Sequence, residues 1–309
     1  MQLLLLHLDD ALELQPDFMR SCLTAGAHEI HASDDGQAIR LWSKEQDFEA
    51  FAGRLTRQMP RMQQDALLCF IGSGDFHHAT SLLLETALQD EEESVTIVHF
   101  DNHPDWTWTL PRRHCGSWVN EVLALPNVER VVTIGPCSDD LMRPDRKGAN
   151  LAPLSSGRLE LFPWRREPSE IRKAISSGAG HVAANGVIRW RNLIDEDWSS
   201  FLCDLKERAP TQRIWITIDK DVLPPTEAVT NWDQGGLPLQ RLIEAIQRLA
   251  ASFTIVGADI CGEYAPIRHR NPFKIIESRL DQPRVGQAPD LSVNARTNER
   301  LMAAFEAVL

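Results

Sequence analysis

The chain has 309 residues, of which 43% are hydrophobic and 25% are charged, and its formal net charge at pH 7 is −12. This surplus of carboxylates argues against a general nucleic-acid-binding protein, because neutralising phosphates requires a surplus of lysine and arginine. No apolar run approaches the roughly 20 residues of a membrane-spanning helix, so we expect no membrane partner. The six cysteines are scattered without a CxxC pair, which favours a reducing, cytoplasmic location.

Short apolar segments alternate with helical patterns along the whole chain. The predicted strands are residues 3–8, 66–71, 95–100, 130–134, 158–162, 213–218 and 253–258. The predicted helices are residues 44–58, 80–88, 117–125, 168–176, 195–208, 239–250 and 294–308. Several strands are apolar on both faces, which is typical of a parallel sheet covered by helices. We therefore predict a three-layer α/β/α fold with a mostly parallel central sheet, as a single domain over residues 1–309.

Two long segments, residues 137–156 and 263–291, carry charges, glycine and proline and have no predicted regular structure. Loops of this length inside a compact domain often serve as lids or interface segments. The role of the second segment is left open.

The strongest chemical signal follows predicted strand 95–100. A D-x-H-x-D motif places Asp101, His103 and Asp105 at alternate positions. In an extended chain these side chains point the same way, at the carboxyl end of a strand, where open α/β sheets place their ligand sites. An exposed acidic turn can have the same sequence, so this motif alone does not establish a metal site.

Two other predicted strands end in residues of the same kind. Strand 213–218 is followed by Asp219 and Asp221, and two such buried carboxylates need a cation to stay ionised. Strand 66–71 is followed by a glycine-containing turn that ends in His77 and His78. Carboxylates and imidazoles without thiolates favour Mn²⁺ over a structural zinc ion. We predict two Mn²⁺ per chain, roughly 3.5–4 Å apart.

Taken together and in this order, the motifs resemble those of the ureohydrolase superfamily, which includes arginase, agmatinase and formimidoylglutamase. The G-D-F-H-H string is similar to the family's G-G-D-H loop, D-N-H-P-D to its D-A-H-x-D, and T-I-D-K-D to its S-x-D-x-D. A G-G-L turn at residues 235–237 and the stretch from Asp259 to Pro266 resemble two further family motifs. The resemblance implies an arginase-like fold and hydrolysis of a guanidino group to urea and an amine.

The resemblance also implies the residues of a binuclear manganese centre. The implied metal ligands are His77 or His78, Asp101, His103, Asp105, Asp219 and Asp221, with Asp101 and Asp219 shared by both ions. Glu263 would bind the guanidinium of the substrate through paired hydrogen bonds. His114 would exchange protons with solvent, and Asp105 would help to deliver a proton to the leaving amine. Without the resemblance, His114 reads equally well as a surface histidine.

The chain departs from the family pattern at several positions. Phe76 is an extra residue in the G-D-H loop, and Pro224 replaces the last aspartate of the second carboxylate motif. One extra residue separates Asp259 from Glu263, so the spacing leaves the placement of that carboxylate in doubt.

The segment after Asp105 departs most from the pattern. Trp106 and Trp108 stand where arginases carry small polar residues that recognise a free amino acid. This variant resembles peptide arginases, which convert arginine to ornithine within ribosomally made peptides. We therefore expect both tryptophans to bind an arginine-containing precursor peptide, although they could equally pack the rim of the site.

Three other functions compete with a peptide arginase. One is a ureohydrolase of free arginine or agmatine. Another is a zinc deacetylase of related fold, for which Tyr264 would be the single tyrosine available. The last is a catalytically silent scaffold, which we rank lowest because the ligand set is complete. The sequence leaves the oligomeric state open, a homo-oligomer included.

Overall fold

The computed structural model describes residues 1–59, 65–89, 93–108, 113–283 and 289–309. Within these residues, eight strands form one sheet in the order β2-β1-β4-β13-β12-β5-β7-β8, and every neighbouring pair is parallel. The strands are β1 (Gln2–His7), β2 (His28–His31), β4 (Leu67–Phe70), β5 (Val95–Phe100), β7 (Val128–Ile134), β8 (Leu159–Phe162), β12 (Arg213–Asp219) and β13 (Thr254–Cys261).

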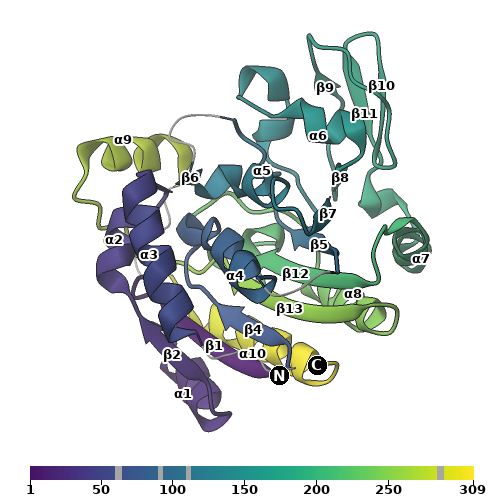
Figure 1. Cartoon of the computed structure of the whole chain (residues 1–309). Helices are drawn as coiled ribbons and strands as arrows, with labels where there is room; N and C mark the ends of the chain where they lie inside the picture. The colour runs from purple at the N-terminus through teal and green to yellow at the C-terminus, as the bar shows by residue number, and fades with distance from the viewer. Residues whose placement is uncertain (60–64, 90–92, 109–112, 284–288) are drawn as a thin grey trace.

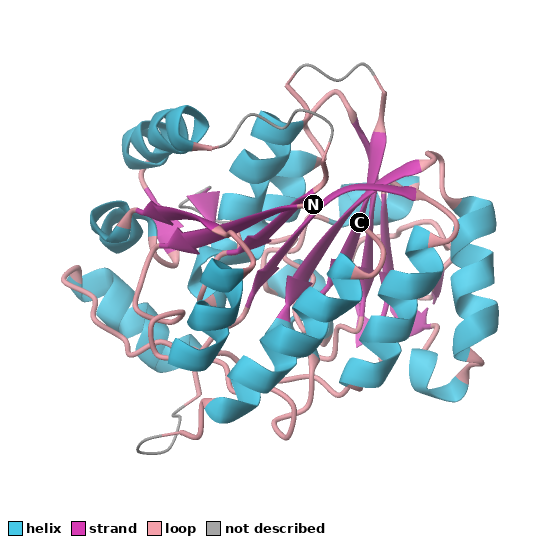
Figure 2. Ribbon diagram, turned by 90° about the horizontal axis from the view of Figure 1, so that it is seen from below, coloured by secondary structure: helices cyan, strands magenta, loops and turns pink. Residues whose placement is uncertain are grey.

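Helices cover both faces of this sheet (Figures 1 and 2). One face carries α3 (Glu45–Gln58), α4 (Ala79–Ala87), α5 (Trp118–Val122) and α6 (Leu151–Ser156). The other carries α1 (Pro16–Thr24), α7 (Trp198–Arg208), α8 (Leu239–Ala250) and α10 (Ser292–Glu306). Successive strand residues enter opposite layers, since Leu4 belongs to the same core cluster as Phe51 of α3, whereas Leu5 belongs to the cluster that contains Phe18 of α1. The predicted three-layer architecture is confirmed.

A small antiparallel sheet replaces the helix that we predicted for residues 168–176. It consists of β9 (Ser169–Glu170), β10 (His181–Ala184) and β11 (Val187–Trp190). The turn between β10 and β11 is Asn185-Gly186, and both residues have positive φ values, 52° and 76°. Such a two-residue turn favours a hairpin, and β11 then pairs with β9. The prediction is wrong because this long-range pairing overrides local helix propensity.

The two long segments contain regular structure. The first includes α6, and the second includes α9 (Pro272–Asp281), whose Glu277 accepts a hydrogen bond at 2.6 Å from the indole of Trp42 in β3 (Trp42–Ser43). Residues 284–288 of the second segment lie outside the described part of the chain. No helix in the described ranges is long and apolar enough to cross a membrane.

The order of the central strands determines where functional side chains meet. β4, β13, β12 and β5 are consecutive neighbours, so their carboxyl ends lie along one edge of the sheet. The register aligns Asp219 with Cys261, and Ile218 with Phe100, the residue before Asp101. The loops that follow β5, β12 and β13 therefore begin side by side at the carboxyl edge of the sheet.

Candidate metal centre and cleft

A histidine and three carboxylates meet at this edge. His77 follows the short turn after β4, and its Nδ1 atom lies 3.1 Å from Asp101 Oδ2 and 3.1 Å from Asp105 Oδ2. The same nitrogen is 3.8 Å from Asp219 Oδ2. Three separate strands thus bring four buried side chains to one point: the predicted Asp101, Asp105 and Asp219, and one of the two histidines that the sequence left open.

A second group adjoins the first. His103 Nδ1 lies 2.9 Å from Asp221 Oδ2 and 3.6 Å from Asp101 Oδ1. Asp101 therefore belongs to both groups and presents a different carboxylate oxygen to each histidine. A carboxylate in this position can bridge two cations.

The electrostatics of these residues fit a pair of divalent cations. His77 is buried, its Nε2 contacts the Thr217 hydroxyl at 2.9 Å, and its Nδ1 has no hydrogen-bond partner among the described residues. Burial and the charge of Asp101 raise the pKa of Asp219 to about 6 and hold the pKa of Asp221 well above its ordinary value. Without a positive charge, such carboxylates bind protons, whereas a cation among them keeps them ionised.

Asp105 occupies a strained position in this cluster. Its φ angle is +45°, in the left-handed region that non-glycine residues rarely adopt. Its Oδ2 accepts a hydrogen bond of 2.6 Å from the indole of Trp118 in α5. The strain and the buried indole together aim the carboxylate at His77, which is typical of functional sites.

His78 does not join the cluster. Its ring stacks on Phe48 of α3 with the centroids 5.5 Å apart, and within the described part of the chain neither ring nitrogen has a hydrogen-bond partner. Burial lowers the pKa of His78 to about 3, so the ring is neutral at physiological pH. Of the two candidates that the sequence left open, the structure brings only His77 to the carboxylates.

Glu263 lies behind the centre and not in the cleft. Its Oε1 accepts from Lys220 Nζ and from Asn298 Nδ2 at 2.6 Å, and its Oε2 accepts from Gln15 Nε2 and Asn294 Nδ2, each at 2.8 Å. These four donors fill the acceptor positions of a carboxylate. The expectation that Glu263 binds the guanidinium is therefore contradicted, because its carboxylate instead neutralises a buried lysine.

The centre forms the floor of a cleft of about 730 Å³. Among the described residues that line this cleft, nine are Asp or Glu and one is a lysine. The predicted residue His114 lies in its wall, with Nε2 3.1 Å from the carboxylate of Glu277 in α9. Trp232 and Asp233, from the loop before α8, line it as well. A cleft of this charge favours a cationic substrate.

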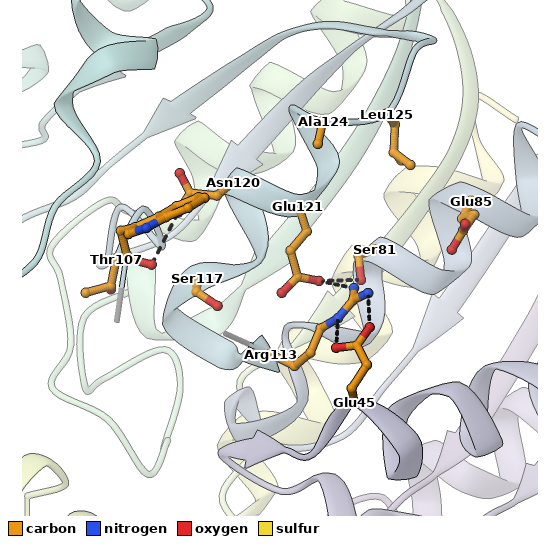
Figure 3. A pocket seen from close by; sticks show the side chains of 11 residues that line it. Glu45, Ser81, Glu85, Thr107, Arg113, Ser117, Asn120, Glu121, Ala124 and Leu125 are labelled. Atoms are coloured by element: carbon orange, nitrogen blue, oxygen red, sulfur yellow. Dashed lines mark hydrogen bonds and ion pairs between the residues drawn. The ribbon is translucent and has the colours of Figure 1, made fainter. Parts of the chain in front are cut away.

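The two tryptophans after Asp105 lie in different surroundings. Trp106 is only 2% exposed and packs in the apolar core, so the structure contradicts a substrate-binding role for it. Trp108 is 65% exposed and lines a second cavity, of about 780 Å³. Figure 3 shows this second cavity, in which Arg113 lies between the carboxylates of Glu45 and Glu121. Thr107 lines both cavities.

Comparisons with known proteins agree with this architecture. No family model matches the sequence. An uncharacterized protein of Thermotoga maritima is 24% identical over 198 residues, which cover 64% of this chain and 58% of that protein. Arginase from Bacillus cereus superposes with a TM-score of 0.61 at 12% identity, covering 99% of this chain and 97% of that one. Formimidoylglutamase from Bacillus subtilis superposes with a TM-score of 0.57 at 15% identity, covering 99% and 85%.

The chain has the arginase fold. Arginase from Bacillus caldovelox, at a TM-score of 0.60 and 15% identity over 98% of this chain and 96% of that one, supports the same conclusion. The predicted resemblance to ureohydrolases is thus confirmed at the level of the fold. Sequence identities of 12–15% to these enzymes establish the fold of this chain but not its activity. The activity therefore depends on the residues of its own site.

Two side chains that the sequence analysis did not assign lie at the centre of this arginase-fold chain. His99 Nε2 is 2.8 Å from Asp101 Oδ2, and Cys261 Sγ is 3.4 Å from Asp219 Oδ2. His99 stands two residues before Asp101 in the same extended segment, so the alternation that we applied to Asp101 and His103 could have found it. Cys261 required the pairing of β12 with β13, which the sequence does not specify.

His77→Ala and His78→Ala form a matched pair of variants for the ligand assignment. We expect His77→Ala to lose bound metal, because it removes the nitrogen that faces three carboxylates. His78→Ala should keep its metal but unfold at a lower temperature, because it leaves a cavity under α3. Elemental analysis of both variants after manganese reconstitution is the measurement. Equal metal content in the two variants would contradict the assignment.

Proposed function

We propose that this protein is a binuclear manganese amidinohydrolase, which hydrolyses a guanidino group to urea and an amine. The observation that carries the proposal is a pair of side-chain groups that share Asp101, one with His77 and Asp105 and the other with His103 and Asp221, on the floor of an acidic cleft. The arginase fold supports it, because several chains of this fold are named as enzymes that act on guanidino or related groups.

The ligand sets follow the two groups of side chains. One ion would be held by His77, Asp101, Asp105 and Asp219, and the other by His103, Asp101, Asp219 and Asp221. These oxygen and imidazole donors suit Mn²⁺. When bound, a pair of divalent ions supplies activation of water at neutral pH and stabilisation of the charge that develops during the reaction.

The side chains around the centre bind and orient a planar cation. Asp233 is half exposed, and its Oδ1 lies 2.9 Å from His103 Nε2, so this carboxylate orients the imidazole and also faces the cleft. The ring of Trp232 lies 5.7 Å from that of His103 and offers an aromatic surface beside it. Guanidinium groups bind both to carboxylates and to aromatic faces. We assign Trp232 and Asp233 the recognition that the sequence had given to Glu263.

His114 and Glu277 provide a route for protons between the cleft and solvent. Nδ1 of His114 accepts a hydrogen bond of 2.8 Å from the amide of Gly116, so the ring proton lies on Nε2 and is shared with Glu277. Burial lowers the pKa of His114, but Cys115 and Glu277 together raise it well above its ordinary value. The Nε2 atom of His114 can then exchange its proton with Glu277, and Asp105, beside the centre, helps to deliver a proton to the leaving amine.

The substrate class that we propose is an arginine residue within a peptide, which the reaction would convert to ornithine. Thr107 lines both the cleft and the second cavity, which Figure 3 shows. A guanidino side chain in the cleft therefore leaves room for neighbouring peptide residues in the second cavity, which Trp108 also lines. Free arginine or agmatine would use the cleft alone. Acetyl-lysine, the substrate of the deacetylase alternative, is neutral and gains nothing from the carboxylates that line the cleft besides the four assigned to the metal ions. The free cysteines of the described chain are consistent with a cytoplasmic enzyme.

Trp108→Ala tests the peptide substrate. We expect kcat/KM for arginine peptides to fall about fivefold, because an aromatic contact is worth about 1 kcal/mol. The value for agmatine should stay unchanged, since agmatine does not reach the second cavity. Urea release from L-arginine, agmatine and a panel of arginine peptides gives these ratios. If free arginine matches every peptide, or if the variant affects agmatine equally, the peptide proposal fails and an ordinary ureohydrolase remains.

A further inference from the structure

A second cluster of metal-binding side chains lies at the other end of the same sheet edge. It consists of His7 at the end of β1 and of Glu29 and His31 on β2, the strand at the border of the sheet. β4 and β13 separate these strands from β12 and β5, which carry most of the candidate centre. The proposed amidinohydrolase function makes no use of this cluster.

The strand register brings the three side chains together. His7 pairs with His31 across the two parallel strands, and their rings lie 4.4 Å apart at an interplanar angle of 19°. Glu29 stands two residues before His31 and therefore on the same face of β2. Its Oε1 is 3.2 Å from His7 Nε2 and 3.9 Å from His31 Nε2.

The buried histidine offers a free lone pair to this point. His7 is only 3% exposed, and its Nδ1 is 2.7 Å from the carboxylate of Glu13. The Nε2 atom, although 3.2 Å from Glu29, has no hydrogen-bond partner among the described residues. In the neutral ring, a proton on Nδ1 that is donated to Glu13 leaves Nε2 as an acceptor that faces the Glu29 carboxylate. A cation between them would be bound by both this nitrogen and the Glu29 carboxylate.

In zinc sites, the ring nitrogen of a histidine ligand that does not bind the metal is often hydrogen-bonded to a carboxylate. Zinc accepts imidazole and carboxylate ligands at about 2.0–2.2 Å in tetrahedral geometry, which places ligand atoms about 3.3 Å apart. The distances of 3.2 and 3.9 Å from Glu29 Oε1 bracket that value. His31 is 69% exposed, so its ring is free to turn its nitrogen toward the ion.

We propose that His7, Glu29 and His31 bind one Zn²⁺, with Glu13 as the outer carboxylate that orients His7. The ion would cross-link the edge strand β2 to its neighbour β1. It also holds the segment after β1, in which Glu13 lies two residues before Gln15, the residue that donates to Glu263 behind the candidate centre.

The test compares the zinc content of the wild-type protein, His31→Ala and His28→Ala. His28 is a matched control, because it is exposed on the same strand and contacts Gln58 instead of the cluster. After removal of metals and equilibration with micromolar Zn²⁺, wild type and His28→Ala should each bind one more zinc ion than His31→Ala. The test compares zinc content between variants, so its outcome does not depend on how many zinc ions the candidate metal centre binds in each of them. Equal zinc content in all three proteins overturns the proposal.

Glu13→Gln separates the outer carboxylate from the ligands. We expect its zinc affinity to fall 10- to 100-fold at unchanged stoichiometry, because outer partners typically have that effect. Zinc should also raise the melting temperature of wild type and His28→Ala but not that of His31→Ala, since an ion that binds the folded state stabilises it. An equal zinc-induced shift in His31→Ala would contradict the site.

Discussion

Replacing Asp101 by alanine is expected to remove both manganese ions and to lower turnover by about 10³-fold or more. Asp101 faces His77 through Oδ2 at 3.1 Å and His103 through Oδ1 at 3.6 Å, so a single change takes one ligand from each group. Without Asp101, no carboxylate among the described residues faces both His77 and His103, so neither ion keeps its full set of ligands. Electrostatic stabilisation lost at a reacting centre typically costs a rate factor of about this size.

Asp139→Ala is the control for this change. Asp139 lines the same cleft, but its carboxylate is exposed at the rim and pairs with Arg166. We expect this variant to keep its manganese and most of its turnover. Manganese content and urea release, measured side by side on both variants, decide the question. Full metal occupancy in Asp101→Ala would show that Asp101 is not a bridging ligand.

Glu263→Gln is expected to destabilise the protein by about 3–5 kcal/mol, because it leaves the buried ammonium of Lys220 without its counter-charge. Lys220 and Glu263 are both fully enclosed, and Asn298 and Asn294 complete their hydrogen bonds. The double variant Lys220→Met with Glu263→Gln should recover part of this loss, because no lone charge remains.

Chemical denaturation in the presence of a chelator measures these effects without a contribution from bound metal. Kinetics then distinguish the two roles of Glu263. If Glu263→Gln unfolds like the wild type but loses turnover, its carboxylate binds substrate after all and the structural role fails.

The sequence predicts the central sheet well because buried parallel strands are apolar on both faces. The apolar pattern predicts a strand over residues 95–100, and β5 (Val95–Phe100) has the same bounds. The candidate metal centre was predictable in part for the same reason, since Asp101, His103 and Asp219 follow such strands. The chain turns after each strand, into a 3-10 helix at Lys220–Val222 and through a positive φ at Asp105, so side-chain alternation alone does not place Asp221 and Asp105.

The remaining features depend on partners distant in the chain. β2 (His28–His31) has only four residues and mixed polarity, so its identity as a strand comes from pairing with β1. Glu263 matched a substrate-binding motif, but Lys220 and α10 hold its carboxylate away from the cleft. The position of Trp106 directly after Asp105 predicts that it lies at the rim of the site, but in the folded chain its side chain is buried. No local signal in the sequence reports any of these contacts.

Urea release by the manganese-reconstituted protein tests the central claim most directly. We predict that urea appears from arginine peptides in proportion to bound manganese, that chelation abolishes it, and that Asp101→Ala produces none. If the reconstituted protein forms no urea from any arginine peptide, from agmatine or from arginine, it is not an amidinohydrolase, whatever its fold.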